Sequence, residues 1–121
     1  MLFRSMPFLQ DRTLSLWRKK GKETVLHNFA GGASDGANPI GGAILDAQGN
    51  FYGDTDGGGP SDDGTIFELS NKGSLTLLHS FAGSDGGTPF AGVIRDAKGN
   101  LYGTTLEGGT DGDGVVWKLT P

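Results

Sequence analysis

The chain of 121 residues is long enough for one modest domain, but 35% hydrophobic residues are few for a large core, and 23 glycines indicate many turns. The net charge of -4 argues against nucleic acid as a partner, and the absence of cysteine excludes a disulfide framework, thiolate chemistry and cysteine-bound metals. No apolar run approaches the roughly 20 residues of a membrane-spanning helix, so we expect no membrane insertion.

The first segment, residues 1–12, matches nothing later in the chain. We expect it to be a disordered or loosely packed lead-in. Its apolar stretch is interrupted by Gln10, Asp11 and Arg12, so it is not a convincing signal peptide.

The rest of the chain repeats itself. The phrase "DAQGNFYGDT" from Asp46 returns fifty residues later as "DAKGNLYGTT", and 17 of the 36 positions paired between 35–70 and 85–120 are identical. Upstream, "LHNF" and "LHSF" lie 52 residues apart, because the first copy has two extra residues in a glycine-rich loop. We therefore divide the chain into the tail of a partial repeat (13–34), a complete repeat (35–84) and a second repeat without its last strand (85–121).

Within the complete repeat, apolar and polar residues alternate in short segments bounded by Gly, Asn and Asp, which indicates strands joined by turns. We predict strands over 42–47, 50–55, 64–70 and 75–81, with turns at Gln48-Gly49 and at "NKGS". Gly49-Asn50 and Gly99-Asn100 suit tight hairpin turns, since both residue types tolerate positive φ.

Four antiparallel strands in each fifty-residue unit are typical of a β-propeller blade. We predict an all-β fold of propeller-like four-stranded blades, with about two repeats plus a partial N-terminal one. A β-sandwich remains an alternative, but it gives no reason for two nearly equal units. Blades bury both faces, and "GAIL", "TIF" and "LTLL" place apolar residues on both sides of their strands.

The series "LHSFAGSDGGTPFAGVIRDAKGNLYGTT", followed by "GGTDGDGVVWKLTP", resembles the GloVer tandem repeat of bacterial proteins from Thr13 to Pro121. The resemblance implies propeller-like β structure and an extracellular or cell-surface location. Members often have an export signal and a C-terminal anchor, and from the sequence as it stands we expect neither a signal at its start nor a tail after Pro121. The resemblance implies no catalytic residues.

Open blade edges favour self-association. The last repeat lacks its fourth strand, while "ETVLHNF" near the N-terminus has the sequence of such a strand. In a ring of copies, we expect that this strand could complete a neighbour's last blade.

His27 and His79 occupy equivalent places, each two residues before a phenylalanine. Proton transfer would need a positioned partner and a cleft, so we expect packed, hydrogen-bonded histidines instead. We also expect Asp46 and Asp96 to bind the main chain of their hairpin turns. Four strand aromatics are expected in the core rather than as sugar platforms: Tyr52, Phe67, Tyr102 and Trp117.

Acidic residues in the loops are the candidate ligand-binding residues: Asp54, Asp56, Asp62, Asp63, Glu107, Asp111 and Asp113. Oxygen-rich loops can hold calcium, for which the candidates are Asp54, Asp56 and Asp62. However, Thr65 stands where a glutamate would complete such a loop, and the second copy has Thr104 and Leu106 in place of two of the aspartates. We therefore expect solvated turn aspartates and no cofactor.

No nucleophile elbow, phosphate loop or zinc spacing occurs in the sequence. We expect a non-enzymatic β-repeat module for recognition or scaffolding, with a glycan or a protein as ligand. The alternative is a propeller enzyme that acts on glycans through loop carboxylates, which would need carboxylates converging from different blades, one of them with a raised pKa.

Overall fold

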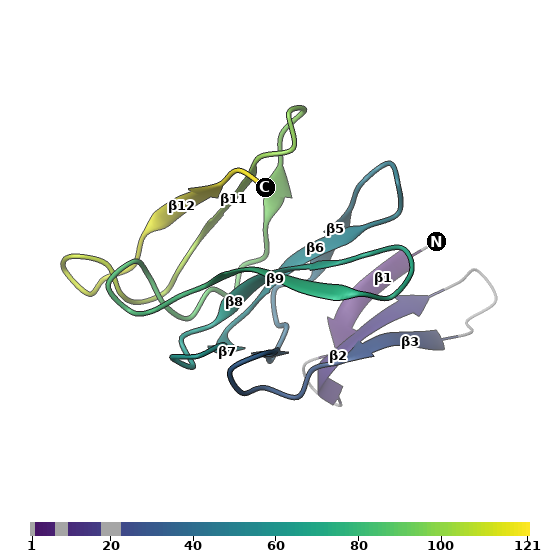
Figure 1. Cartoon of the computed structure of the whole chain (residues 1–121), viewed down its shortest axis with the longest axis horizontal. Helices are drawn as coiled ribbons and strands as arrows, with labels where there is room; N and C mark the ends of the chain where they lie inside the picture. The colour runs from purple at the N-terminus through teal and green to yellow at the C-terminus, as the bar shows by residue number, and fades with distance from the viewer. Residues whose placement is uncertain (1, 7–9, 18–22) are drawn as a thin grey trace.

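Every regular element in the described part of the chain is a β-strand (Figure 1). The computed structural model describes residues 2–6, 10–17 and 23–121, with side chains from Thr24 onward. The strands are β1 (Leu2–Met6), β2 (Gln10–Trp17), β3 (Glu23–Asn28), β4 (Gly36–Ala37), β5 (Ala43–Leu45), β6 (Phe51–Thr55), β7 (Gly57–Gly58), β8 (Thr65–Leu69), β9 (Leu75–Ser80), β10 (Ile94–Arg95), β11 (Leu101–Thr104) and β12 (Val116–Leu119).

Three antiparallel sheets follow one another along the chain. The N-terminal sheet has the order β1-β2-β3, the central sheet β5-β6-β8-β9 and the C-terminal sheet β10-β11-β12, and a two-stranded ribbon joins β4 to β7. The predicted all-β fold with antiparallel sheets is confirmed. The central sheet contains the four strands predicted for the complete repeat, each within about three residues of the predicted bounds.

The repeat in the sequence is also a repeat in strand pairing. The β2-β3 and β8-β9 hairpins share one register, including an irregularity that follows Leu14 in one and Ile66, 52 residues later, in the other. The β6-β8 and β11-β12 pairs share a register at a spacing of fifty, so that Phe51 opposite Leu69 becomes Leu101 opposite Leu119. An added residue in one strand bends it locally, and this bend recurs in the same place.

The N-terminal sheet extends further back than the repeat in the sequence. Leu2–Met6 forms β1, which pairs with β2 on the edge opposite β3. The structure differs here from the expectation of a disordered lead-in over residues 1–12, of which residues 1 and 7–9 lie outside the described residues. Main-chain pairing needs no particular side chains, so β1 can form without matching the repeat. The strand "ETVLHNF" is β3, and it is paired with β2.

The core consists of two clusters, one on each face of the central sheet. On its rear face, which points toward the N-terminal sheet, Phe51, Phe67 and Leu69 pack with Phe29, and the rings of Phe29 and Phe67 are 5.1 Å apart. The forward face points toward the C-terminal sheet. It contributes Tyr52, Ile66 and Phe81, which pack with two residues of the next unit, Val93 and Leu101. The prediction that a unit buries both faces holds for the central sheet.

The connections lie at opposite ends of the sheets. We call the end formed by residues 46–50, 70–74 and 96–100 the turn end, and the end formed by 30–42, 56–64, 82–92 and 105–114 the loop end. In Figure 1 the β5-β6 and β10-β11 hairpins point toward the top of the view, and the segment around β7 lies at the bottom. The loop end contains most of the predicted site residues.

Candidate functional site

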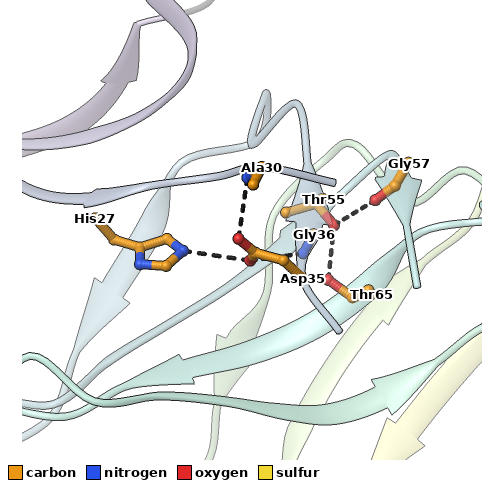
Figure 2. Close-up of polar contacts among 7 residues, drawn as sticks. All are labelled: His27, Ala30, Asp35, Gly36, Thr55, Gly57 and Thr65. Atoms are coloured by element: carbon orange, nitrogen blue, oxygen red, sulfur yellow. Dashed lines mark hydrogen bonds and ion pairs between the residues drawn. The ribbon is translucent and has the colours of Figure 1, made fainter. Parts of the chain in front are cut away.

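Each histidine binds an aspartate in the loop end. The Nε2 atom of His27 lies 3.2 Å from an oxygen of Asp35 (Figure 2), and that of His79 lies 2.8 Å from an oxygen of Asp85. The main-chain N–H of Ala82 donates a hydrogen bond to the other oxygen of Asp85 at 2.9 Å. This N–H and the histidine together lower the pKa of Asp85, against a smaller effect of burial.

The histidine rings also pack against phenylalanines. His27 meets Phe29 edge to face, with ring centroids 4.5 Å apart, and His79 meets Phe81 in the same way at 4.8 Å. These contacts confirm the prediction that both histidines are packed against neighbouring rings and hydrogen-bonded. The aspartate takes the Nε2 atom and fixes the ring, so each pair anchors the loop that follows a fourth strand.

A pair of threonine hydroxyls lies beside the first histidine pair, as Figure 2 shows. The Oγ1 atoms of Thr55 and Thr65 are 2.6 Å apart, and that of Thr55 donates to the carbonyl of Gly57 at 2.8 Å. Both threonines are fully buried. A Cβ on Gly36 would lie 2.6 Å from Thr55, so the main chain packs directly over these hydroxyls. They therefore hold the loop and are not exposed nucleophiles.

Main-chain hydrogen bonds connect the loops of the loop end to one another. The N–H of Gly59 donates to Gly32 and Asp35, and the N–H of Gly109 donates to Gly83, each at 2.9 Å. In a further bond, the N–H of Thr88 donates to the carbonyl of Asp63 at 2.7 Å. This bond joins the loop 82–92, which follows β9, to the loop 56–64, which precedes β8. We call these bonds the loop clasp.

Two equivalent positions of the loop end share an unusual backbone conformation. Asn38 and Thr88, fifty residues apart, both have positive φ, at 61° and 53°. Their carbonyls accept hydrogen bonds from the N–H groups of Asp56 and Leu106, at 3.2 and 3.1 Å. A threonine in this region is strained, so the surrounding bonds must hold it there.

The loop end presents most of the predicted acidic residues. Asp62, Glu107, Asp111 and Asp113 are exposed, and Asp56 and Asp63 are half-buried. Asp62 accepts a hydrogen bond from the N–H of Gly58 at 2.7 Å, and Glu107 accepts one from the hydroxyl of Thr88 at 3.1 Å. None of the four loop segments contains lysine or arginine, so this end of the molecule is acidic.

Asp54 lies apart from the other acidic residues. The sequence places Asp54 both at the end of the predicted strand 50–55 and among the loop carboxylates. In the structure it belongs to β6 and is 0% exposed on the forward face of the central sheet, so it is not a loop carboxylate. Neither oxygen has a hydrogen bond of good geometry within the described part, although the N–H of Gly92 lies near enough to favour the ionised form. Burial raises the pKa of Asp54 to about 7, and the charge of Asp56 adds to the effect.

The calcium candidates are separated by this arrangement. Within residues 2–6, 10–17 and 23–121, no three acidic or histidine side chains form a group that could hold a metal ion. Asp54 is fully buried, whereas Asp62 is exposed and its carboxylate accepts a hydrogen bond from the main-chain N–H of Gly58. The three aspartates therefore do not converge.

The turn end is built by a clamp that appears twice. Asp46 accepts hydrogen bonds from the N–H groups of Gln48 and Asn50, the side-chain amide of Asn50 and the hydroxyl of Tyr52, at 2.9 to 3.1 Å. Gly49 has a φ of 87°, which closes the turn. The expected bonding of Asp46 to its turn is confirmed, while Asn50 contributes its side-chain amide instead of a positive φ.

The clamp shifts the acidity of its members. Although burial acts in the opposite direction, the hydrogen bonds from Asn50, Tyr52 and Gln48 lower the pKa of Asp46. Burial, a bond to Asp46 and the nearby Glu68 raise the pKa of Tyr52 to about 12. In the second copy, the side chain of Asn100 is the main reason that the pKa of Asp96 falls to about 2. The ionised carboxylate therefore holds the turn.

The sequence from residue 13 to residue 121 matches the model of one family, the Gloeobacter/Verrucomicrobia repeat. The chain belongs to the Gloeobacter/Verrucomicrobia repeat family. No curated protein matches the chain. No solved structure matches it.

The GloVer resemblance drawn from the sequence is thereby confirmed. In this Gloeobacter/Verrucomicrobia repeat, "LHxF" with the following "DG" makes the histidine–aspartate pair, and "DxxGNxY" makes the clamp of the turn end. Of the four aromatic residues expected in the core, Phe67 and Tyr52 are buried, and Tyr102 and Trp117 are half-buried. No helix of the described residues is long and apolar enough to span a membrane.

Proposed function

We propose that this repeat protein is a non-enzymatic recognition or scaffolding module whose ligand, a glycan or another protein, binds at the loop end. The observation that carries the proposal is the combination of a fixed main chain and exposed carboxylates at that end. The loop clasp holds neighbouring loops together, and Asp111 and Asp113 extend from it into solvent.

Preorganised loops support binding because little conformational entropy is lost when a ligand arrives. Carboxylates accept hydrogen bonds from sugar hydroxyls and pair with basic side chains of a protein. The same acidic surface disfavours nucleic acid, whose phosphates would be repelled. The family resemblance favours an extracellular or cell-surface setting, in which glycans and proteins are the available ligands.

We propose that the sheets stack as propeller blades. Each sheet places its forward face on the rear face of the next, with the same residues of the repeat in contact, as Phe29 and Phe81 illustrate. Sheets packed in this way around an axis form a propeller, in which loops from several blades meet at one end. Self-association is the route to further blades.

The enzymatic alternative finds little support. It requires an accessible carboxyl with a raised pKa, and among the carboxyls of residues 24–121 the one whose pKa is raised, Asp54, is 0% exposed. The Nε2 atoms of the histidines are held by Asp35 and Asp85, and the hydroxyls of Thr55 and Thr65 beside the first pair are fully buried and bonded to each other. A binding module needs neither group.

The test is binding of the purified chain to an array of neutral and cationic glycans. We expect at least one class to bind, and we expect a variant with Asp111→Asn and Asp113→Asn to bind at least about tenfold less tightly. Lys98→Gln at the turn end is the matched control, and it should leave binding unchanged. Equal binding by the loop variant would contradict the loop end as the binding face, and cleavage of a bound glycan would contradict a non-enzymatic role.

A further inference from the structure

Among the described residues, no strand pairs with the outer side of β12, where the other two sheets have a strand. β12 pairs with β11 on one side, whereas β2 and β8, its counterparts, pair on their second side with β3 and β9. The carbonyl of Val115 accepts the N–H of Thr105, so by alternation the main-chain groups of Val116 and Lys118 point to the uncovered edge.

A cavity lies beside this edge. It has a volume of about 190 Å³ and is lined by His79 and Phe81 of the central unit and by Trp117 and Leu119 of β12. The corresponding space between the N-terminal and central sheets is filled by Leu75 and Leu77 of β9, which pack with the Phe29 and Phe67 cluster. The cavity is therefore the space that two leucines of a fourth strand would occupy.

We propose that the edge of β12 and the adjoining cavity bind an extended segment with the sequence pattern of the repeat's fourth strand. The repeat specifies the occupant: in both existing copies this strand is antiparallel, has an added residue at the same place, and ends in His-x-Phe. The occupant's leucines enter the cavity and its main chain bonds to Val116 and Lys118.

The chain's own fourth strands do not serve as the occupant. β3 and β9 are each paired within their sheets, so moving either to β12 would break one ladder of hydrogen bonds to form another. A segment that is not already paired adds a ladder without breaking one, and when such a segment is offered as a peptide the mode of binding is β-augmentation. This proposal does not depend on what the loop end binds.

The test uses the full chain and a labelled synthetic peptide with the sequence of residues 74–86, "SLTLLHSFAGSDG". Fluorescence anisotropy should show saturable binding. Val116→Pro removes an outward N–H at an edge position that tolerates proline, and should weaken binding at least about tenfold. Val116→Thr is the matched control because it changes the side chain and keeps the N–H, and it should bind like the unmodified chain.

A second arm alters only the peptide, so it does not depend on the folding of a protein variant. Serine in place of both leucines that correspond to Leu75 and Leu77 should weaken binding by about a hundredfold, because these side chains fill the cavity. Absence of saturable binding by the original peptide would overturn the proposal. So would equally tight binding of the serine peptide, or of the original peptide to a folded Val116→Pro chain.

Discussion

Replacing Asp54 by asparagine should change how the stability of the chain depends on pH. Burial raises the pKa of this carboxyl from 3.8 to about 7, so the folded state binds a proton more tightly than the unfolded state does. Between about pH 4 and pH 7 the folded chain holds a proton that the unfolded chain has released, and stability therefore falls as the pH rises through this window.

The magnitude follows from the difference between the two pKa values. Each tenfold change in proton affinity is worth about 1.4 kcal/mol, so the full window corresponds to about 4 kcal/mol, and about 2 to 3 kcal/mol of it lies above pH 5. Asparagine has nearly the same shape and cannot ionise. The Asp54→Asn chain should therefore be more stable than the unmodified chain by about 1 to 2 kcal/mol at pH 5 and by about 4 kcal/mol at pH 8.

Urea unfolding at pH 5 and pH 8 measures this difference. Asp111→Asn is the matched control, since it removes an exposed carboxylate from a loop, and its pH dependence should equal that of the unmodified chain. The lowered pKa values of Asp46 and Asp96 act at lower pH than this window. If the unmodified chain and Asp54→Asn lose the same stability between the two pH values, the carboxyl of Asp54 is not the cause.

Three further predictions concern the repeat itself. Asp46→Ala removes the acceptor of four hydrogen bonds at the turn end and should lower the free energy of unfolding by about 1 kcal/mol in urea, whereas Gln48→Ala should leave it unchanged. Gly53→Ala would place a Cβ 2.8 Å from the ring of Phe67 and should cost about 1 to 3 kcal/mol in the same assay; an unchanged midpoint would show that the core yields at this place. The phenol of Tyr52 should ionise near pH 12 when absorbance at 295 nm is followed, later than a free tyrosine at about 10, and Tyr52→Phe should remove that late step.

The sequence predicts the strands well because their signals are local. In the complete repeat, alternation of apolar and polar residues marks each strand, and Gly49 and Gly73 mark the turns between them. These features depend on neighbouring residues only. The strand β1 has no counterpart in the repeat, and its pairing with β2 is a contact between main chains that no sequence pattern records.

The histidine–aspartate pairs are harder to predict. His27 is eight residues before Asp35, whereas His79 is six residues before Asp85, because the first loop has the two-residue insertion. The unequal spacing hides the pairing. The signal that could have revealed it is the presence in both copies of "LHxF" followed by the next "DG".

The burial of Asp54 is a tertiary effect. The sequence places it next to a glycine-rich acidic loop, and its counterpart Thr104 is exposed. It is buried because the C-terminal sheet covers the forward face of the central sheet, and single-sequence patterns do not show which sheet faces which.

The loop clasp leaves side chains unconstrained. Its bonds between loops run from one main-chain group to another, so they persist whichever side chains the exposed positions have, as at Ser34, Pro60, Ser84 and Thr110. These positions can be randomised while the scaffold stays the same. One end of the molecule is therefore suited to mutagenesis libraries, from which binders of new targets could be selected without redesigning the fold.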